Sequence, residues 1–293
     1  LFRTVQQYLD AGGQREVVAE EFWPVLKRVL QRLAEGAEPG IFVDGDGLLH
    51  CGNRHTQLTW MDAAVDGEPV TPRWGRTVEI CALWYNALHT ARKLAAAFGE
   101  SYSLPVAPEK TADAFRKCFC RPDCDWLADT VNEDGADTAL RPNQLFAFSL
   151  PFSPVSRKTA LRCLQHVRNR LLTPRGLRTL DPRHPHYRRR YDGSPSERDR
   201  SYHQGTVWPW LLGPYADACL RCRPGDPATR QHLESLLSGW RDHLKEAGIG
   251  TVSEVFDGDP PHRPGGCIAQ AWSVAELIRF AFIVSEGERP CES

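Results

Sequence analysis

Apolar side chains recur every three or four residues along much of the chain, the spacing that places them on one face of an α-helix. The pattern is clearest at Val18, Phe22, Val25, Val29 and Leu33. Glycine and proline clusters separate the periodic segments, as is usual at helix ends. The pattern predicts helices at residues 1–9, 18–33, 77–98, 109–119, 160–171, 205–222, 228–247 and 268–286.

The connections between these helices are long and polar. Residues 41–49 and 126–135 contain turn signals between apolar residues, which indicate small β-hairpins. Residues 177–201 are basic and rich in proline, so we expect a long loop there. The chain shows neither an alternation of strands and helices nor a repeat of fixed length. We therefore predict an all-α fold, in which residues 1–293 form one domain, a toroid of helical hairpins with its ligand pocket in the loops at one end.

Composition narrows the classes of function. The chain has 36 Lys and Arg against 37 Asp and Glu, a balance that favours neither nucleic acid nor an anionic membrane as a partner. No apolar run approaches membrane-spanning length. The ten cysteines are scattered through helical patterns, which favours free thiols in a cytoplasmic protein. The spacing of Cys118, Cys120 and Cys124 is irregular for zinc, and no phosphate-binding glycine loop is present, so we expect no metal and no cofactor.

Residues 250–266 form a proline-rich acidic stretch between two predicted helices, which is longer than a simple connection requires. It contains Glu254, Asp257 and Asp259, and another acid, Asp62, lies far upstream after Trp60 and Met61. Two carboxyl groups facing each other across a pocket can cleave a glycosidic bond. The residues alone leave alternatives open, because Asp62 could equally be a helix N-cap and the two aspartates could shape the turn.

The chain also has nine tryptophans and several polar groups at helix starts, a mixture that suits sugars. Each candidate has a structural alternative: a turn, a core position or a helix cap. The predicted sugar-binding residues are Asp44, Asp46, Trp60, Arg141, Asn143, Gln144, Tyr202, His203, Gln204, Trp208, Trp210, Asp257 and Asp259.

Several long segments resemble the C-terminal domain of glycogen debranching enzymes, the amylo-α-1,6-glucosidase module. They are QLTWMDA at 57–63, TPRWGRTVEICALWYNAL at 71–88, RPNQLFAFSLPFSP at 141–154, YHQGTVWPWLLGPYADA at 202–218 and SEVFDGDPPHRPGGCIAQAWSVAEL at 253–277. The resemblance implies an (α/α)6 barrel, of which this chain would lack the first helices and an N-terminal region. It also differs in places, since Ala64 stands where the family often has Lys, and residues 65–70 lack a Trp often found there.

The resemblance further implies inverting removal of a single α-1,6-linked glucosyl stub from glycogen or another branched α-glucan, such as a limit dextrin. In that reaction Asp62 would be the general acid and Glu254 the general base. Specificity depends on the shape of the loops, so another exo-glycosidase of the same fold, such as a trehalase or an oligosaccharide glucosidase, is an alternative. A non-catalytic carbohydrate-binding remnant is a second alternative.

Overall fold

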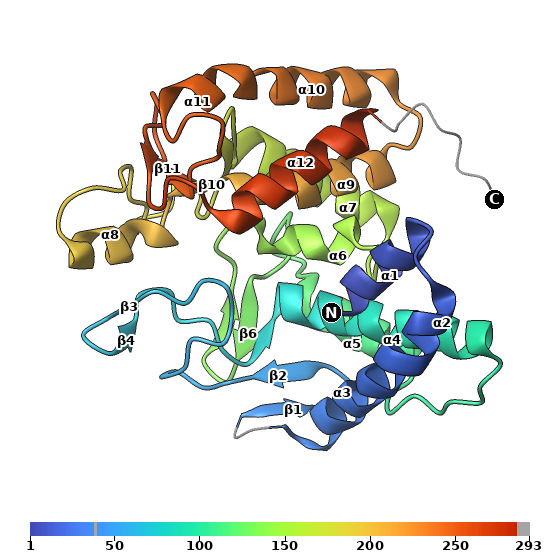
Figure 1. The fold of residues 1–293 in the computed structure, drawn as a ribbon. Helices are drawn as coiled ribbons and strands as arrows, with labels where there is room; N and C mark the ends of the chain where they lie inside the picture. The colour runs from blue at the N-terminus through green and yellow to red at the C-terminus, as the bar shows by residue number, and fades with distance from the viewer. Residues whose placement is uncertain (38–39, 286–293) are drawn as a thin grey trace.

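The computed structural model describes residues 1–37 and 40–285, and helices make up about half of it (Figure 1). In the N-terminal part, α2, a π-helical turn (η1) and α3 follow one another without a break, as the long apolar pattern predicts. The helical elements are α1 (Phe2–Asp10), α2 (Arg15–Val17), η1 (Val18–Phe22), α3 (Trp23–Glu35), α4 (Val78–Phe98), α5 (Pro108–Phe119), η2 (Pro142–Leu145), α6 (Phe146–Ser149), α7 (Arg157–Arg170), α8 (Pro195–Tyr202), η3 (Pro209–Leu211), α9 (Leu212–Cys222), α10 (Pro227–Ser238), α11 (Trp240–Glu246) and α12 (Ala271–Ser285).

Helix α4 joins the two hydrophobic cores of the protein. Its first turns, including Val78 and Cys81, belong to the larger core, which extends through α5, α6, α7, α9 and α12. Trp84 and Leu88 belong to a smaller core shared with α1 and α3. The helix ends at Gly99, whose φ of 68° is the left-handed conformation typical of a helix C-terminus. Apolar residues on several faces of α4 thus explain why it packs against both cores.

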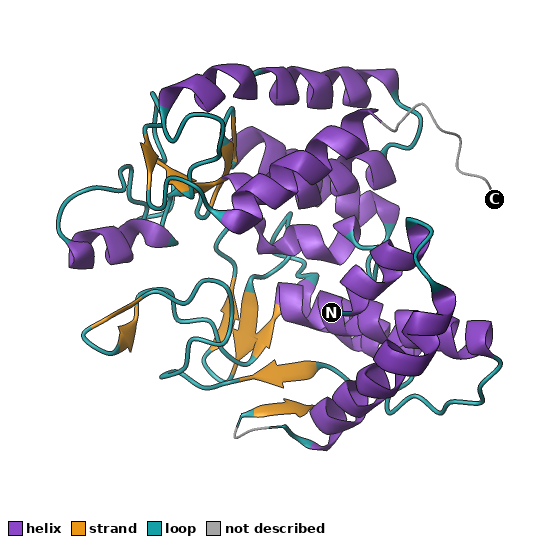
Figure 2. Ribbon diagram, viewed as in Figure 1, coloured by secondary structure: helices purple, strands orange, loops and turns teal. Residues whose placement is uncertain are grey.

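Short antiparallel strands gather on the side of the molecule where the long loops lie (Figure 2). Two hairpins and a three-stranded sheet account for the first seven strands. These strands are β1 (Ile41–Val43) with β2 (Leu49–Cys51), β3 (Ala64–Val65) with β4 (Glu68–Pro69), and β5 (Arg76–Thr77) with β6 (Thr130–Asn132) and β7 (Gly135–Asp137).

A five-stranded sheet in the order β12-β11-β10-β9-β8 connects three distant parts of the chain. Val207 in its central strand pairs with Arg178 on one side and Phe256 on the other. The sequence predicts only small hairpins, because strands of two or three residues are too short to show a periodic pattern. The strands are β8 (Leu172–Thr173), β9 (Gly176–Arg178), β10 (Val207–Trp208), β11 (Val255–Phe256) and β12 (Pro264–Gly265).

Three further expectations need correction. The loop predicted at 177–201 contains β9 and most of α8, which begins with a capping box between Ser194 and Glu197. The helix predicted from residue 205 starts as strand β10 and η3, and only α9 is α-helical. No helix follows Asp62, since the next element is strand β3, so this residue is not a helix N-cap. The predicted end of the last helix, residue 286, lies outside the described residues.

None of the helices in residues 1–37 and 40–285 combines the length and apolarity needed to cross a membrane. The nine cysteines within the same residues are free thiols, and most are buried or half-buried.

Candidate active site

Glu254 lies directly before β11, and three donors hold its side chain. Oε1 accepts hydrogen bonds from the hydroxyl of Tyr202 and from Nε2 of Gln270 at 3.0 Å. Oε2 accepts one from the backbone N–H of Cys267 at 2.7 Å. Gly266 makes this approach feasible, because a Cβ at this position would lie 2.4 Å from Oε2 of Glu254. The carboxylate is therefore fixed by the loop that follows it and by a residue at the end of α8.

Tyr202 connects the two predicted catalytic acids. Burial raises the pKa of Tyr202, and the hydrogen bond to Glu254 and the charge of Asp62 raise it further. Asp62 itself is exposed and lies between Met61 and strand β3. Both carboxylates thus act on the hydroxyl of Tyr202, so Asp62 and Glu254, which are far apart in the sequence, lie in one region of the structure. Although the apolar Trp60 and Met61 precede it, the described part of the chain does not enclose the side chain of Asp62.

An aromatic cluster lies beside these acids. The ring of Trp60 meets those of His203, Trp208 and Trp210 edge to face, with centroids 5.4, 5.6 and 5.0 Å apart. Trp272, at the start of α12, stacks on Trp210 at 5.0 Å. Trp208 and Trp210 belong to the core, whereas 36% of Trp272 is exposed and Trp60 is half-buried. Only Trp60 and Trp272 in this cluster thus present ring surface toward solvent.

His203 is fully buried within this cluster, and neither of its ring nitrogens has a hydrogen-bond partner among the described residues. Burial lowers the pKa of His203 to about 3, and the nearby charges of Arg141 and Arg73 act in the same direction. A neutral imidazole has one donor and one acceptor nitrogen, so it can bond to an uncharged hydroxyl group. The structure therefore places an unused polar group beside the aromatic rings.

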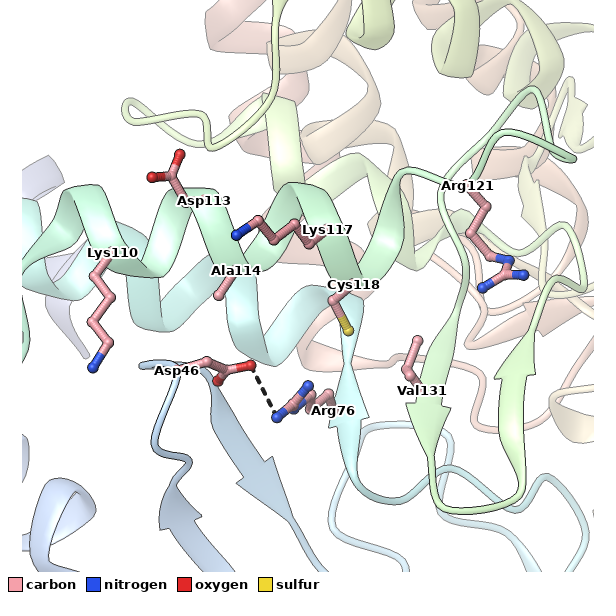
Figure 3. Close-up of a pocket in the computed structure, with 9 residues that line it drawn as sticks. All are labelled: Asp46, Arg76, Lys110, Asp113, Ala114, Lys117, Cys118, Arg121 and Val131. Atoms are coloured by element: carbon pink, nitrogen blue, oxygen red, sulfur yellow. Dashed lines mark ion pairs between the residues drawn. The ribbon is translucent and has the colours of Figure 1, made fainter.

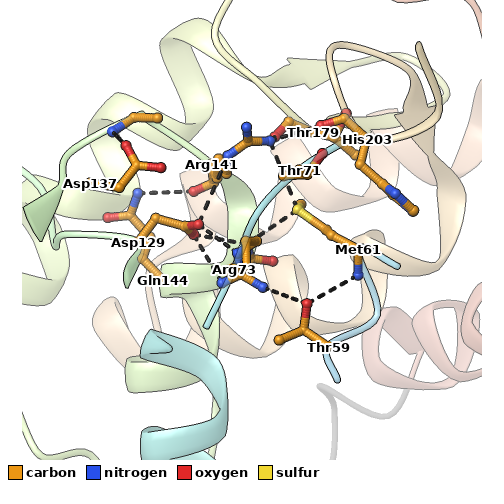
Figure 4. Close-up of polar contacts among 12 residues, drawn as sticks. Thr59, Met61, Thr71, Arg73, Asp129, Asp137, Arg141, Gln144, Thr179 and His203 are labelled. Atoms are coloured by element: carbon orange, nitrogen blue, oxygen red, sulfur yellow. Dashed lines mark hydrogen bonds and ion pairs between the residues drawn. The ribbon is translucent and has the colours of Figure 1, made fainter. Parts of the chain in front are cut away.

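A buried ionic network supports the segment that leads to Asp62 (Figure 4). Arg73 bonds to Asp129 through Nε at 2.6 Å and to Glu79 through Nη2 at 2.6 Å, and its Nη1 donates to Thr59 at 3.1 Å. Burial by itself would lower the pKa of Arg73, but Asp129 and Glu79 raise it above the ordinary value. The guanidinium therefore stays charged and holds Thr59, three residues before Asp62.

Arg141, Asn143 and Gln144, which the sequence predicts at the edge of a sugar pocket, are buried behind this segment. Asn143 accepts from Nε1 of Trp60 at 2.7 Å and donates to Asp129 at 2.8 Å, which fixes the indole. Arg141 donates to the carbonyl of His203 at 2.7 Å. In this structure their bonds go to protein groups, so direct contact with a sugar stays a prediction for all three.

Gln204 also ties two segments of the site together. Its Nε2 donates to the carbonyl of Val70 at 3.1 Å and to the hydroxyl of Thr71 at 3.0 Å. Its Oε1 accepts from Arg141 at 3.1 Å. This side chain therefore joins the end of α8 to the chain that follows Asp62.

Asp257 and Asp259 hold the neighbouring basic loop. Asp257 accepts from the backbone N–H of Tyr191 at 2.8 Å, and Asp259 accepts from the hydroxyl of Tyr187 at 2.9 Å. Burial and the bond to Asp259 raise the pKa of Tyr187 to about 12. Both side chains thus bond to residues 187–191 of another loop, and their binding to a sugar remains a prediction.

Asp44 and Asp46 lie in the turn between β1 and β2, which α4 and α5 hold through bonds to the carbonyl of Gly47. Both carboxylates pair with Arg76, at 2.7 and 3.0 Å. Arg76 and Asp46 line an open cavity of about 630 Å³ beside α5 (Figure 3). Both carboxylates are thus paired with a protein group in this structure, and their binding to a sugar stays a prediction.

The sequence interpretation missed several supporting residues. Arg73 and Asp129 are charged residues in segments that contain many apolar ones, and only their burial and their contacts identify them as a network with Glu79, for which its helical position already favours a structural role. Gln270 lies directly before an apolar helix, a position that the sequence shows, but nothing in the sequence indicated its hydrogen bond to Glu254.

Comparison with known proteins gave consistent results. A family model described as amylo-alpha-1,6-glucosidase matches residues 1–279. The glycogen debranching enzyme of Saccharomyces cerevisiae is 26% identical over 313 residues, which cover 87% of this chain and 20% of that protein. The chain thus spans about a fifth of the length of this relative.

Two solved structures share the fold. Mannosylglycerate hydrolase from Thermus thermophilus, determined with glucose, matches with a TM-score of 0.51 and 16% identity, covering 70% of this chain and 47% of that one. Neutral trehalase from Saccharomyces cerevisiae matches with a TM-score of 0.53 and 13% identity, covering 75% and 40%. Such low identity shows the fold alone, and it agrees with the predicted helix-rich glycosidase architecture. The closed ring of six hairpins stays a prediction.

Proposed function

Because the chain belongs to the amylo-alpha-1,6-glucosidase family, we propose that it provides the hydrolytic site of a glycoside hydrolase. The substrate is a single α-1,6-linked glucosyl stub on glycogen or a similar branched α-glucan, and the products are free glucose and a debranched chain. One observation carries this proposal: Tyr202 bonds to Glu254 and also senses the charge of Asp62. Two carboxyl groups of the kind that glycoside hydrolysis requires therefore belong to one region.

Glu254 is the general base in this proposal. A carboxylate offers about four lone-pair positions, and three donors occupy positions on Glu254, two at Oε1 and one at Oε2. The remaining position is on Oε2, where a water molecule can bind and lose a proton as it attacks the anomeric carbon. Donors that face a carboxylate stabilise its charged form, which is the form that a base needs.

Asp62 is the general acid and protonates the departing glycosidic oxygen. An inverting pair stands roughly 6.5–9.5 Å apart, which leaves room for the attacking water on the opposite face of the sugar. Since Asp62 is exposed in the described chain, we propose that the bound glucan removes water from this side chain and favours its protonated form. The bonds from Arg73 to Thr59 and from Asn143 to Trp60 keep the preceding residues in place.

Trp60 and Trp272 are the proposed stacking surfaces for the sugar, because they keep exposed ring area beside the acids. The ring nitrogens of His203 have no partner among the described residues, but the side chain is fully buried, so a bond to a glucose hydroxyl requires a rearrangement that exposes the imidazole. The buried Trp208 and Trp210 support these rings from behind. This arrangement suits an uncharged, hydroxyl-rich ligand.

The test is to incubate the protein with a branched limit dextrin and to follow the released glucose by NMR. We expect glucose, initially as the β-anomer. The α-anomer would overturn the inverting assignment, and no glucose would overturn the substrate. A panel of α-1,6, α-1,4, α-1,2 and α,α-1,1 glucosides separates this activity from that of a trehalase or an oligosaccharide glucosidase. Glucan binding without turnover of any glucoside would favour a binding module.

A further inference from the structure

Gln270 links the proposed base to the start of α12. Its backbone N–H donates to the carbonyl of Val252 at 3.2 Å, and its own carbonyl accepts from Val274 at 3.0 Å in the first turn of the helix. Its side-chain Oε1 accepts from the backbone N–H of Ala271 at 3.0 Å, and its Nε2 donates to Oε1 of Glu254 at 3.0 Å. All four polar groups of this residue therefore have a partner.

This pattern determines which way the amide faces. The backbone N–H of Ala271 can only donate, so the oxygen of the Gln270 amide must face it. The NH2 group is then directed at Glu254 and always offers a hydrogen to it. Because both the oxygen and the nitrogen of this amide are hydrogen-bonded, the amide cannot rotate without losing two hydrogen bonds. Gln270 therefore holds the carboxylate of Glu254 in one position.

We infer that Gln270 is a positioning residue for Glu254, an inference that rests on the proposed function. Together with Tyr202, it occupies Oε1 of Glu254, so that the free lone pair on Oε2 is directed at the attacking water. Trp272, two residues further on, stacks on Trp210 and anchors the same helix end. The start of α12 thus sets the orientation of the base and, in the same turn, presents a ring to the sugar.

Gln270→Glu separates this role from a merely structural one. The new carboxylate keeps the length of glutamine and can still accept from the backbone N–H of Ala271, and a negative charge at a helix N-terminus is favourable. The variant should therefore fold with an unchanged melting temperature. Its second oxygen, however, faces Glu254 with like charge, so the pair holds a proton at pH values where the wild type does not. We expect the acidic limb of the kcat/KM profile to move up by about one pH unit or more.

Gln270→Met removes the donor while it keeps the volume. We expect kcat to fall about ten- to hundredfold and KM to stay near the wild-type value, because Gln270 bonds to the base rather than to the sugar. A fall in the melting temperature with kcat unchanged would instead indicate a structural role and would overturn the inference.

Gln31→Glu is the matched control. Nε2 of Gln31 also donates to a carboxylate, that of Glu35 at 2.6 Å, but on the exposed surface of α3. This variant should leave the pH profile unchanged, and an equal shift in both variants would overturn the inference.

A readout independent of catalysis keeps the inference testable if the wild type releases no glucose. Carboxyl carbon NMR can follow the titration of Glu254, with Glu254→Gln to assign its signal. Its midpoint should move to higher pH in Gln270→Glu. An unchanged midpoint would refute the positioning role, whereas a shifted midpoint in an inactive protein would refute only the proposed function.

Discussion

Gly266→Ala tests whether the position of Glu254 matters. The added Cβ would lie 2.4 Å from Oε2 of Glu254, whereas ordinary contacts begin at 3.4 Å. The carboxylate must therefore withdraw by about 1 Å, because it ends a flexible side chain, whereas the Cβ is bonded directly to Cα and moves only with the backbone. That movement weakens the 2.7 Å bond from the backbone N–H of Cys267 and displaces the proposed water site. A displacement of this size in an active site can lower the rate by about a hundredfold.

Gly250→Ala provides the control in the same loop. Both glycines have positive φ, 69° at Gly266 and 83° at Gly250, so alanine at either position is strained by about 1–2 kcal/mol. A Cβ at Gly250, however, meets no atom within 4 Å. The two variants should therefore lose similar free energy of unfolding, and only Gly266→Ala should lose activity beyond that effect.

The assay measures initial glucose release from limit dextrin, together with the free energy of unfolding from urea titration. We expect kcat of Gly266→Ala to be about a hundredfold below that of Gly250→Ala, at similar stability. Equal rates in the two variants would mean that Glu254 can move without consequence, and the reasoning that makes it the base would be wrong.

Three further predictions concern the surrounding residues. Asp62→Asn should lower glucose release by about a thousandfold or more, whereas Asp66→Asn, on the exposed β3–β4 turn, should leave the rate unchanged; equal losses would contradict the acid assignment. His203 has a pKa of about 3 in the folded protein and about 6.5 in the unfolded chain. Below about pH 6.5 the unfolded chain therefore binds a proton that the folded protein does not. The free energy of unfolding is thus unaffected by protonation of this residue above about pH 6.5, and it falls by about 1.4 kcal/mol for each unit that the pH drops between 6.5 and 3. The loss in unfolding free energy between pH 7.5 and 5.0 should thus be about 2 kcal/mol smaller in His203→Phe than in the wild type, and an identical loss would contradict a buried neutral imidazole. Arg73→Met removes the cation that pairs with the buried Glu79 and leaves Asp129 with the 3.8 Å ion pair to Arg141. It should cost about 3–5 kcal/mol in a urea titration, while the exposed Arg54→Met should cost less than about 1 kcal/mol; similar costs would contradict the buried network.

The sequence by itself determined most of the helices. Apolar spacing located α1, α4, α5 and α7 within a few residues of their observed bounds, because the side chains that each helix buries recur every three or four residues. It also identified the two loops that contain Asp62 and Glu254, since long acidic or aromatic connections are unnecessary for joining helices alone. Helix positions and the candidate loops can be predicted from neighbouring residues in the sequence, because neither depends on which distant segments of the chain come into contact.

Only the tertiary structure decided how these loops are held together. The five-stranded sheet depends on pairing between residues as far apart as Val207 and Phe256, and strands this short have no signal of their own. Whether a polar residue faces a ligand or another protein group is likewise a matter of burial. Asn143 holds Trp60 in the loop before Asp62 and Arg141 holds the carbonyl of His203, while Gln270 reaches Glu254 from the start of the last helix. The physical reason is that side-chain type sets which hydrogen bonds a residue can form, but packing between distant segments sets which partner it meets.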